Sequence, residues 1–512
     1  ATTDKLFQKV QLKNAIENDI SGNVEDIVVT AYAIQSTEVA DINLAPSDDG
    51  TLGKDILDQV YTVYLNQSSD QTARPAEEGD RSQTGKLGTI TYELDGGSLE
   101  GALTEYGTAD YGYTPPAPTK KGYEFIGWEP ENIPADSTGS VTFTAKWEES
   151  TATLLDGQTL NVMMKTLAGD SSPKYNSSNT TITAIQYSDT EPSESVKSDA
   201  NFLASAVSSN KPVYMWYEDG VIKWWSEAKL ISAPEDLSCL CAMMNKLSDI
   251  SGLANFDTAV VSNMDYSFLG CNSLATLDGL QDWNTKNVTT MIATFSRCAI
   301  TSLVPLAHWD VKNVTTMGTN FSGTFAGCIY LTDVNSLANW NTSNVTDMDS
   351  LFMDCTALTD ISGIANWNTA KVTNMHYMFH TCESLTNLEA LKNWDISHVT
   401  NMHCMFEACK SIAGLSPLKD WDTRSVTDAA GLFASCNSLT SLDGLQNWDT
   451  TNTTAMNSMF SSCEGLVSTS EIENWNIANV TNFSNMFMNC PSHPTFAKRA
   501  GTWNDGTFVP DN

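Results

Sequence analysis

The sequence predicts a multidomain protein whose second half is a solenoid of repeated units. The chain has 512 residues, which is too long for a single hydrophobic core. In its second half, tryptophan and cysteine recur mostly at intervals of 27 residues. The segments before these repeats follow different patterns, so we expect separate domains there.

Composition restricts the classes of function. Hydrophobic residues make up 41% of the chain and charged residues 17%, which is enough apolar content to fold. The formal net charge is −35, from 27 Lys and Arg against 62 Asp and Glu. Such an acidic surface repels nucleic acid and anionic membranes, so neither is an expected partner. No apolar run approaches the roughly 18 residues of a membrane span, so we expect no membrane insertion.

Residues 1–67 form the first predicted segment. Lys5–Ile20 could make an amphipathic helix or a strand pair, Ile27–Tyr32 is strand-like, and Lys54–Leu65 has helical spacing. So short a segment cannot readily cover its own apolar faces. We therefore predict that it attaches the chain to a carrier assembly and forms a homo-oligomer, with residues 68–88 as a polar linker.

The termini show no membrane, lipid or wall anchor, so we expect a protein contact to hold the chain in place. The first residues do not form a signal peptide. Either a signal was cleaved before Ala1, or Ala1 followed a methionine that was removed. Residues 491–512 are expected to be a C-terminal cap or tail.

Residues 89–149 predict a small β-rich module with an aromatic core. Thr89–Leu94 alternates like a strand, and Asp95-Gly96-Gly97 supplies a turn. The Gly-Gly turn, the stretch Pro-Thr-x-x-Gly-Tyr-x-Phe-x-Gly-Trp at 118–128 and the closing Ala-Lys-Trp at 145–147 resemble the internalin B-type repeat, also called the Listeria–Bacteroides repeat. That resemblance implies a compact β-grasp-like module, used as a spacer or adhesive piece on extracellular proteins.

Residues 150–235 are predicted to cap the N-terminal end of the repeats. Pro212–Trp225 has the pattern of two strands around the Asp219-Gly220 turn, which predicts a β-hairpin. A stack of repeats needs a cap because its first unit would otherwise expose apolar side chains. Trp224 and Trp225 could instead stack on a sugar.

Residues 236–490 contain the repeats, and the segment from Trp340 to Ile364 shows one unit. Its apolar positions from Val345 onward have offsets 0, 3, 6, 7 and 10, which predicts one face of a short helix. Every third residue from Leu358 to Ile364 is then apolar, which predicts a short strand near 358–361. A single unit cannot bury its own apolar face, so the units are expected to stack.

Stacking turns each repeated apolar position into a ladder. The predicted structural ladder consists of Trp283, Trp309, Trp340, Trp367, Trp394, Trp421, Trp448 and Trp475 together with Cys271, Cys298, Cys328, Cys355, Cys382, Cys409, Cys436, Cys463 and Cys490. We expect the cysteines to be reduced core residues, because zinc needs clustered ligands and disulfides need a geometry that stacked units rarely give. The Asn or Asp after each tryptophan favours a side-chain turn hydrogen bond over calcium binding. No cofactor is expected.

The repeats resemble the BspA-like leucine-rich repeat family of microbial surface proteins. The resemblance lies in the recurring pattern Trp-(Asn/Asp)-(Thr/Ile/Val)-x-x-Val-Thr-x-Met-x-x-(Met/Leu)-Phe-x-x-Cys-x-x-Leu, which covers about half of the chain. It implies a leucine-rich-type solenoid that presents a recognition surface.

The repeat is interrupted once, between Met317 and Phe325. The methionine and phenylalanine lie eight residues apart there, whereas Met348 and Phe352 lie four apart. Four extra residues must therefore protrude from the stack, either as a binding feature or through neutral drift. These candidate binding residues are Thr319, Asn320, Phe321 and Ser322.

The sequence contains no phosphate-binding loop, zinc motif or nucleophile elbow, so we expect no enzyme. A carboxylate pair for glycoside cleavage stays open, as does a weak metal site among the histidines from His376 to His403. We predict an extracellular display or adhesion protein that recognises a protein or glycan ligand on a cell surface. Its carrier would be a bacteriophage particle or a bacterial envelope, and the alternatives are a secreted bacterial adhesin and a purely structural appendage.

Overall fold

The computed structural model describes residues 86–511, and residues 1–85, which include the predicted attachment segment and most of the linker, lie outside the described residues. The described residues divide into two compact units. One holds the described residues up to Glu93 with Ala102–Pro115 and Pro130–Phe143, and the other holds Leu94–Gly101, Pro116–Glu129 and everything from Thr144 onward. The described chain is rich in strands and bridges, has few helices and forms no closed barrel.

The region before Ser150 contains a four-stranded sheet with the strand order β2-β1-β4-β3. Its strands are β1 (Gly88–Glu93), β2 (Glu105–Tyr106), β3 (Tyr123–Glu129) and β4 (Val141–Glu149), and a 3-10 turn, η2, covers Thr108–Asp110. Alternation along β4 places Phe143 and Ala145 in the interior, as expected for a sheet with one buried face. Trp128 is also buried, and its indole N–H donates to the carbonyl of Pro116 at 3.3 Å.

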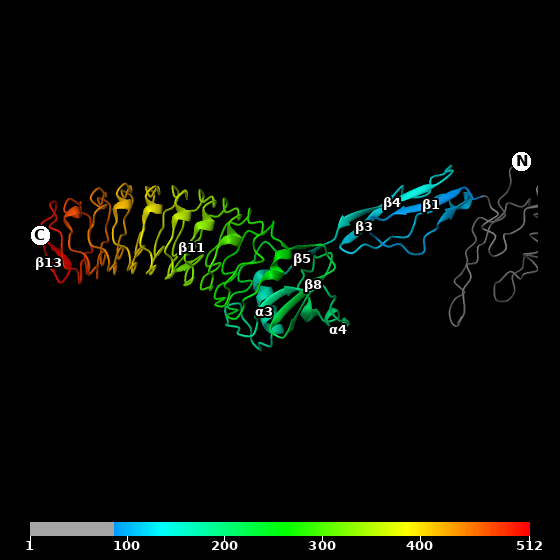
Figure 1. Cartoon of the computed structure of the whole chain (residues 1–512), viewed down its shortest axis with the longest axis horizontal. Coiled ribbons are helices and arrows are strands. Elements are labelled where there is room, and N and C mark those ends of the chain that lie inside the picture. Colours follow the sequence, from blue (N-terminus) through cyan, green and yellow to red (C-terminus); the bar gives the residue numbers. More distant parts are fainter. Residues whose placement is uncertain (1–85, 512) are drawn as a thin grey trace, which may run out of the picture. The chain divides into compact units, whose positions relative to one another are not determined.

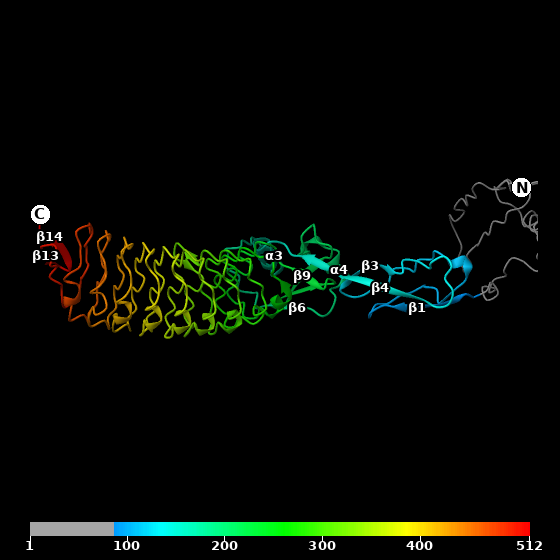
Figure 2. The same ribbon diagram turned by 90° about the horizontal axis from the view of Figure 1, so that it is seen from above.

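A mixed α/β segment follows and leads into the repeats (Figures 1 and 2). Its longest helix, α3 (Gly157–Leu167), begins at Asp156, whose side chain accepts from the backbone N–H of Thr159. The predicted hairpin around Asp219-Gly220 is present, because β7 (Val213–Glu218) and β8 (Val221–Ser226) pair antiparallel. The remaining elements are β5 (Thr151–Thr153), β6 (Ala184–Tyr187), α4 (Glu194–Lys197), η3 (Ala200–Phe202), β9 (Leu230–Ser232), η4 (Ser251–Asn255) and β10 (Phe256–Asp257).

Helix α3 closes the N-terminal end of the stack by replacing the hydrogen-bond donors of a missing unit. Three of its residues, spaced four apart and therefore on one helix face, face the carbonyls of the first unit. The N–H of Gly157 donates to Asp236 O at 3.0 Å, and Asn161 Nδ2 donates to Ala242 O at 3.1 Å. Lys165 Nζ donates to Ala242 O at 2.9 Å and to three further carbonyls. Burial lowers the pKa of Lys165 to about 8.

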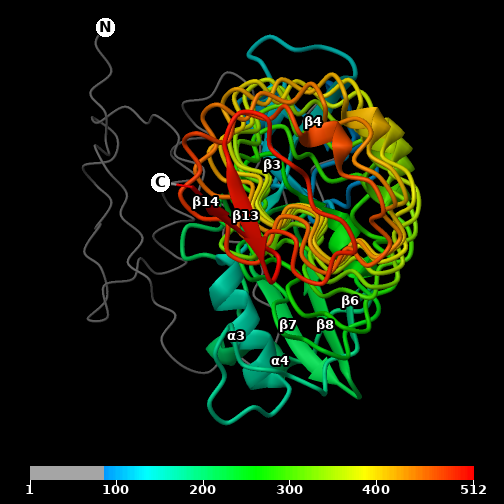
Figure 3. The ribbon, with the colours of Figure 1, turned by 90° about the vertical axis from the view of Figure 1, so that its left-hand side faces the viewer.

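The predicted repeated units are present: successive 27-residue units lie side by side as coils around one continuous core (Figures 1 and 3). A parallel bridge joins equivalent residues of neighbouring coils, as in Asp347↔Asn374 and Asn374↔Asn401. Between positions 348 and 355 the backbone N–H groups alternate in direction. The N–H of Phe352 donates to Met378 O of the next coil at 2.9 Å, whereas that of Leu351 returns to Met348 O at 3.3 Å.

The short helix predicted over the apolar offsets is wrong. This segment is a series of reverse turns, in which Ser350 and Asp354 have positive φ angles of 56° and 59°. An α-helix requires negative φ throughout and satisfies its amides within the segment, whereas here alternate amides bind the next coil. The helix-like offsets arise because each reverse turn brings the chain back to the core after three or four residues.

The strand predicted near 358–361 is also wrong as an extended element. That segment makes one isolated bridge, Asp333↔Asp360, and then enters the 3-10 turn η7 (Ser362–Ile364). The continuous bridge ladder runs instead through the Asp347 position. The equivalent turns of other coils are η5 (Val304–Leu306), η6 (Asn335–Leu337), η8 (Glu389–Leu391), η9 (Ser416–Leu418) and η10 (Ser470–Ile472).

The tryptophan and cysteine positions both point into the core. All eight ladder tryptophans are buried, and each indole N–H donates to a leucine or isoleucine carbonyl of the preceding coil, as Trp367 does to Leu337 O at 3.1 Å. The cysteines are free thiols, and the Sγ of Cys355 donates to Phe325 O at 3.3 Å. Eight of the nine ladder cysteines are buried, and Cys490, in the last coil, is half-buried.

The last coil is covered by a hairpin of β13 (Gly501–Asn504) and β14 (Thr507–Pro510), which Figure 3 shows across the end of the stack. The N–H of Phe487 donates to Gly506 O at 2.8 Å, where a further coil would otherwise supply the acceptor. Phe508 packs on Phe483 and is buried. Both ends of the apolar core are therefore closed within the described residues.

Candidate functional site

The interruption of the repeat forms a short β-hairpin on the surface of the stack. Strands β11 (Gly318–Thr319) and β12 (Ser322–Gly323) pair antiparallel, and β11 is labelled in Figure 1. Asn320 and Phe321 make the turn with positive φ angles of 48° and 67°, as a two-residue type I′ hairpin requires. The four extra residues predicted from the sequence are therefore an ordered hairpin.

Two glycines allow this hairpin to rest directly on the next coil. A Cβ atom at Gly318 would lie 1.8 Å from the carbonyl oxygen of Asp349, and one at Gly323 would lie 1.9 Å from that of Ser350. No other residue fits at such distances without moving the backbone. The side chains of Asp349 and Ser350 are buried, and the backbone N–H of Phe321 donates to Asp349 Oδ1 at 3.3 Å.

Phe321 reaches across the covered coil to the coil beyond it. Its ring centroid lies 4.9 Å from that of Tyr377 and 5.2 Å from that of His376, yet the residue remains 55% exposed. Tyr377 also contacts the rings of His380 and His403. We call these five residues, Phe321, His376, Tyr377, His380 and His403, the hairpin face.

Each histidine of the hairpin face lies beside a carboxylate. His376 Nδ1 lies 3.0 Å from Asp349 Oδ2, and His403 Nδ1 lies 3.5 Å from Asp428 Oδ1. His380 lies between two carboxylates, at 3.6 Å from one and 3.7 Å from the other; these are Asp354 and Glu407.

The pKa values of Asp349 and His403 are shifted by these contacts. Burial alone would raise the pKa of Asp349, but hydrogen bonds from His376 and Ser350 outweigh it, so the pKa is lowered. The hydrogen bond to Asp428 raises the pKa of His403 above its ordinary value. These shifts stabilise the charged forms of both residues.

The sequence located part of this site and missed the rest. Thr319, Asn320, Phe321 and Ser322 do form the projecting feature, and of the histidines from 376 to 403, His376 and His403 approach one another. The sequence alone does not identify Tyr377 and Asp349 as part of the site. The signal that could have found them is register, because His376 and Tyr377 occupy the positions of Asp349 and Ser350 one repeat later.

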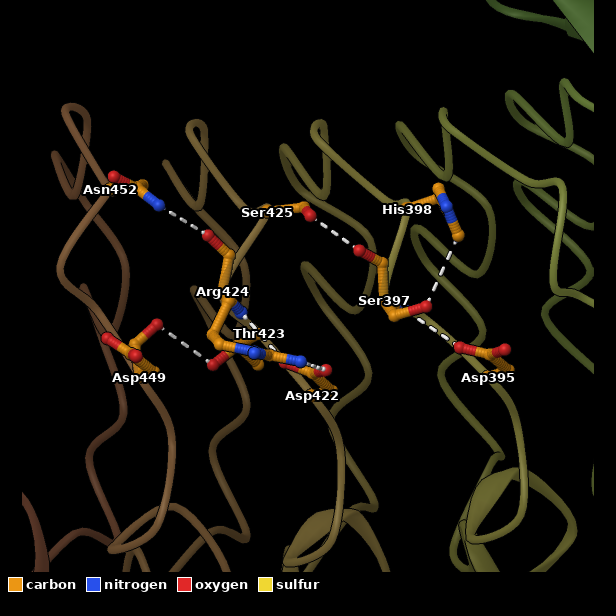
Figure 4. A network of polar contacts seen from close by, with 9 residues as sticks. All are labelled: Asp395, Ser397, His398, Asp422, Thr423, Arg424, Ser425, Asp449 and Asn452. Atoms are coloured by element: carbon orange, nitrogen blue, oxygen red, sulfur yellow. Dashed lines mark hydrogen bonds and ion pairs between the residues drawn. The ribbon is translucent and has the colours of Figure 1, made fainter.

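The asparagine or aspartate after each tryptophan has a structural role. Its side-chain oxygen accepts from the backbone N–H two residues later, so the predicted turn hydrogen bond is confirmed. Figure 4 shows this corner in three coils, where Arg424 pairs with Asp422 at 2.6 Å and Asn452 donates to Arg424 O at 2.8 Å. Every contact of this network stabilises one turn or joins two neighbouring coils.

Residues 86–511 of the structure contain neither a metal site nor a membrane-spanning helix. There, no group of three or more His, Cys, Asp or Glu side chains is arranged to hold a metal ion. Within the same residues, no helix combines the length and apolarity that a membrane crossing requires.

Comparison with known families matches the repeats alone. Residues 236–326, 319–441 and 413–508 each match the sequence profile of a family described as "Mycoplasma protein of unknown function, DUF285". Together these matches span residues 236–508, more than half of the chain. No curated protein and no solved structure matches the chain.

Proposed function

The chain belongs to the DUF285 repeat family, the BspA-like repeat family of Mycoplasma- and Bacteroides-type surface proteins, and we therefore propose that it is a recognition protein without catalytic activity. In this proposal the repeats form a leucine-rich-type solenoid that displays the hairpin face to a ligand on a cell surface. The ligand is a protein or a glycan.

One observation carries the proposal: the hairpin holds Phe321, which is 55% exposed, against the rings of His376 and Tyr377. Elsewhere in the described repeats the aromatic ladders are buried, although Tyr330 is 56% exposed. Phe321 is held by a tight turn and by packing on Tyr377. Because little side-chain freedom is left to lose, such a rigid aromatic contact supports affinity.

The rest of the chain would serve as support for this surface. We propose that the β-rich module at 89–149 is a β-grasp-like spacer and that residues 1–67 attach the chain to its carrier and self-associate. The carrier would be a bacteriophage particle or a bacterial envelope, which places the solenoid outside the cell. Several solenoids side by side would raise avidity for a repetitive target.

The test uses the labelled full chain on a panel of bacterial and host cells, read by flow cytometry. We expect Phe321→Ala to reduce binding at least about tenfold, the loss of one hot-spot aromatic contact. Val304→Ala is the matched control, because Val304 is 66% exposed on the same stack but away from the hairpin.

Two results would decide against this proposal. Equal loss of binding in both variants would show that the hairpin face is not the site. If the intact chain binds no cell type, the repeats act as a structural appendage.

A version of the chain that starts at Lys86 tests attachment. An unchanged oligomeric state and unchanged recovery on the carrier would refute the attachment role proposed for residues 1–67.

A further inference from the structure

We infer that the hairpin face binds a cationic group, supplied by a lysine- or arginine-rich segment of a partner protein. This inference rests on the proposed function and specifies the chemistry of its ligand. It follows from the aromatic rings exposed there and from the charge of the groups around them.

The aromatic rings of the hairpin face favour a cationic ligand. Phe321 and Tyr377 meet at an interplanar angle of 65°, so their faces are inclined to one another. Aromatic faces are electron-rich and attract ammonium and guanidinium groups. Phe321 is 55% exposed, which leaves part of its ring available to a ligand.

The charged groups around the hairpin face also favour a cationic ligand. Four carboxylates contact the histidines of the hairpin face, and the cation facing them is Arg297, which interacts with Asp354. The carboxylates that contact histidines are Asp349, Asp354, Glu407 and Asp428. Asp347 also interacts electrostatically with His376, so with neutral histidines these five carboxylates and Arg297 give a local charge of −5 + 1 = −4.

The charge of the whole molecule acts in the same direction. The net charge of −35 attracts cationic partners and repels sialylated or sulfated glycans before contact is made. A basic protein segment therefore fits both the local and the long-range field. An anionic glycan would have to overcome both.

Protonation of His403 predicts how binding depends on pH. The hydrogen bond to Asp428 raises the pKa of His403 above its ordinary value, so His403 gains its positive charge as the pH falls and makes the local charge less negative. Binding of a cationic ligand should therefore weaken as the pH falls, whereas binding of an anionic ligand should strengthen. The other titratable groups near the histidines of the hairpin face are Asp347, Tyr377 and Cys404.

The experiment measures the affinity of the full chain for a twelve-residue peptide with four lysines, and for the same peptide with acetylated lysines, by calorimetry at low salt. Asp428→Asn is the main variant. It should fold, because asparagine occupies the equivalent position in neighbouring coils, as at Asn401. The matched control is Asp282→Asn, which removes the same charge from an exposed site elsewhere on the stack.

We expect the lysine peptide to bind at least about tenfold more tightly than the acetylated one, as the loss of cation–π and charge contacts implies. Phe321→Ala and Asp428→Asn should each weaken it about five- to tenfold, and Asp282→Asn less than twofold. Equal effects of the two aspartate variants would overturn the inference, because the peptide would then be sensing net charge alone.

Comparison with glycans separates this inference from the proposed function. If a neutral or sialylated oligosaccharide binds in a way that depends on Phe321, while the lysine peptide does not, the hairpin face is a recognition site and its cationic specificity is refuted. If no probe and no cell type depends on Phe321, both proposals fail.

Discussion

Replacing Trp367 with alanine should destabilise the stack of coils strongly. The side chain is 4% exposed, its ring stacks on Trp340 with centroids 6.3 Å apart, and its indole N–H donates to Leu337 O. Truncating a buried aromatic residue of this kind costs about 3–5 kcal/mol, because it removes buried apolar area and leaves a cavity.

Trp367→Phe is the matched variant, since Phe256 precedes the first tryptophan by one repeat length and is itself buried. It keeps an aromatic ring but leaves the Leu337 carbonyl without its donor, so we expect a smaller loss of about 1–3 kcal/mol. Urea unfolding of the full chain, followed by far-UV circular dichroism, gives both values as shifts in the midpoint. An unchanged midpoint for Trp367→Ala would show that the tryptophan side chains do not hold the coils together.

Three further predictions concern the core, the hairpin and pH. Native protein should leave most ladder cysteines unmodified by a thiol reagent, because they are buried and burial raises the pKa of thiols such as Cys328, to about 12; rapid labelling of most of them would contradict this packing. Gly323→Ala should weaken ligand binding by displacing the hairpin from Ser350, whereas Gly414→Ala, where a Cβ meets no atom within 4 Å, should leave it unchanged. The stability that His403 gains from Asp428 should be present below pH 6.5 and lost as the pH rises through its raised folded-state pKa; a His403→Asn variant that loses stability over the same pH range as the parent chain would refute this.

The repeat architecture could be predicted from sequence because it depends on periodicity. Equivalent residues such as Trp340 and Trp367 lie 27 residues apart, and only stacking buries both. The local backbone could not be predicted in the same way. Offsets of three and four residues occur both in helices and in chains of reverse turns, and the positive φ angles at Ser350 and Asp354 leave no pattern in residue type.

The candidate site was partly predictable for a similar reason. A change in repeat length identifies the protruding residues, so Phe321 could be located from sequence alone. The residues that Phe321 contacts depend on how closely the hairpin packs on the next coil. The close approach of Gly318 to the backbone of Asp349 sets that distance. The donors on α3 could not be predicted because Asn161 and Lys165 act on a residue 81 and 77 positions later in the chain.

The most direct measurement removes the hairpin without disturbing the repeat. Deleting residues 319–322 returns the spacing from Met317 to Phe325 to four residues, as found between Met348 and Phe352. We expect this chain to keep its urea midpoint and its far-UV spectrum but to lose cell binding at least about tenfold. Full binding by a well-folded deletion chain would contradict the claim that the hairpin face is the recognition site.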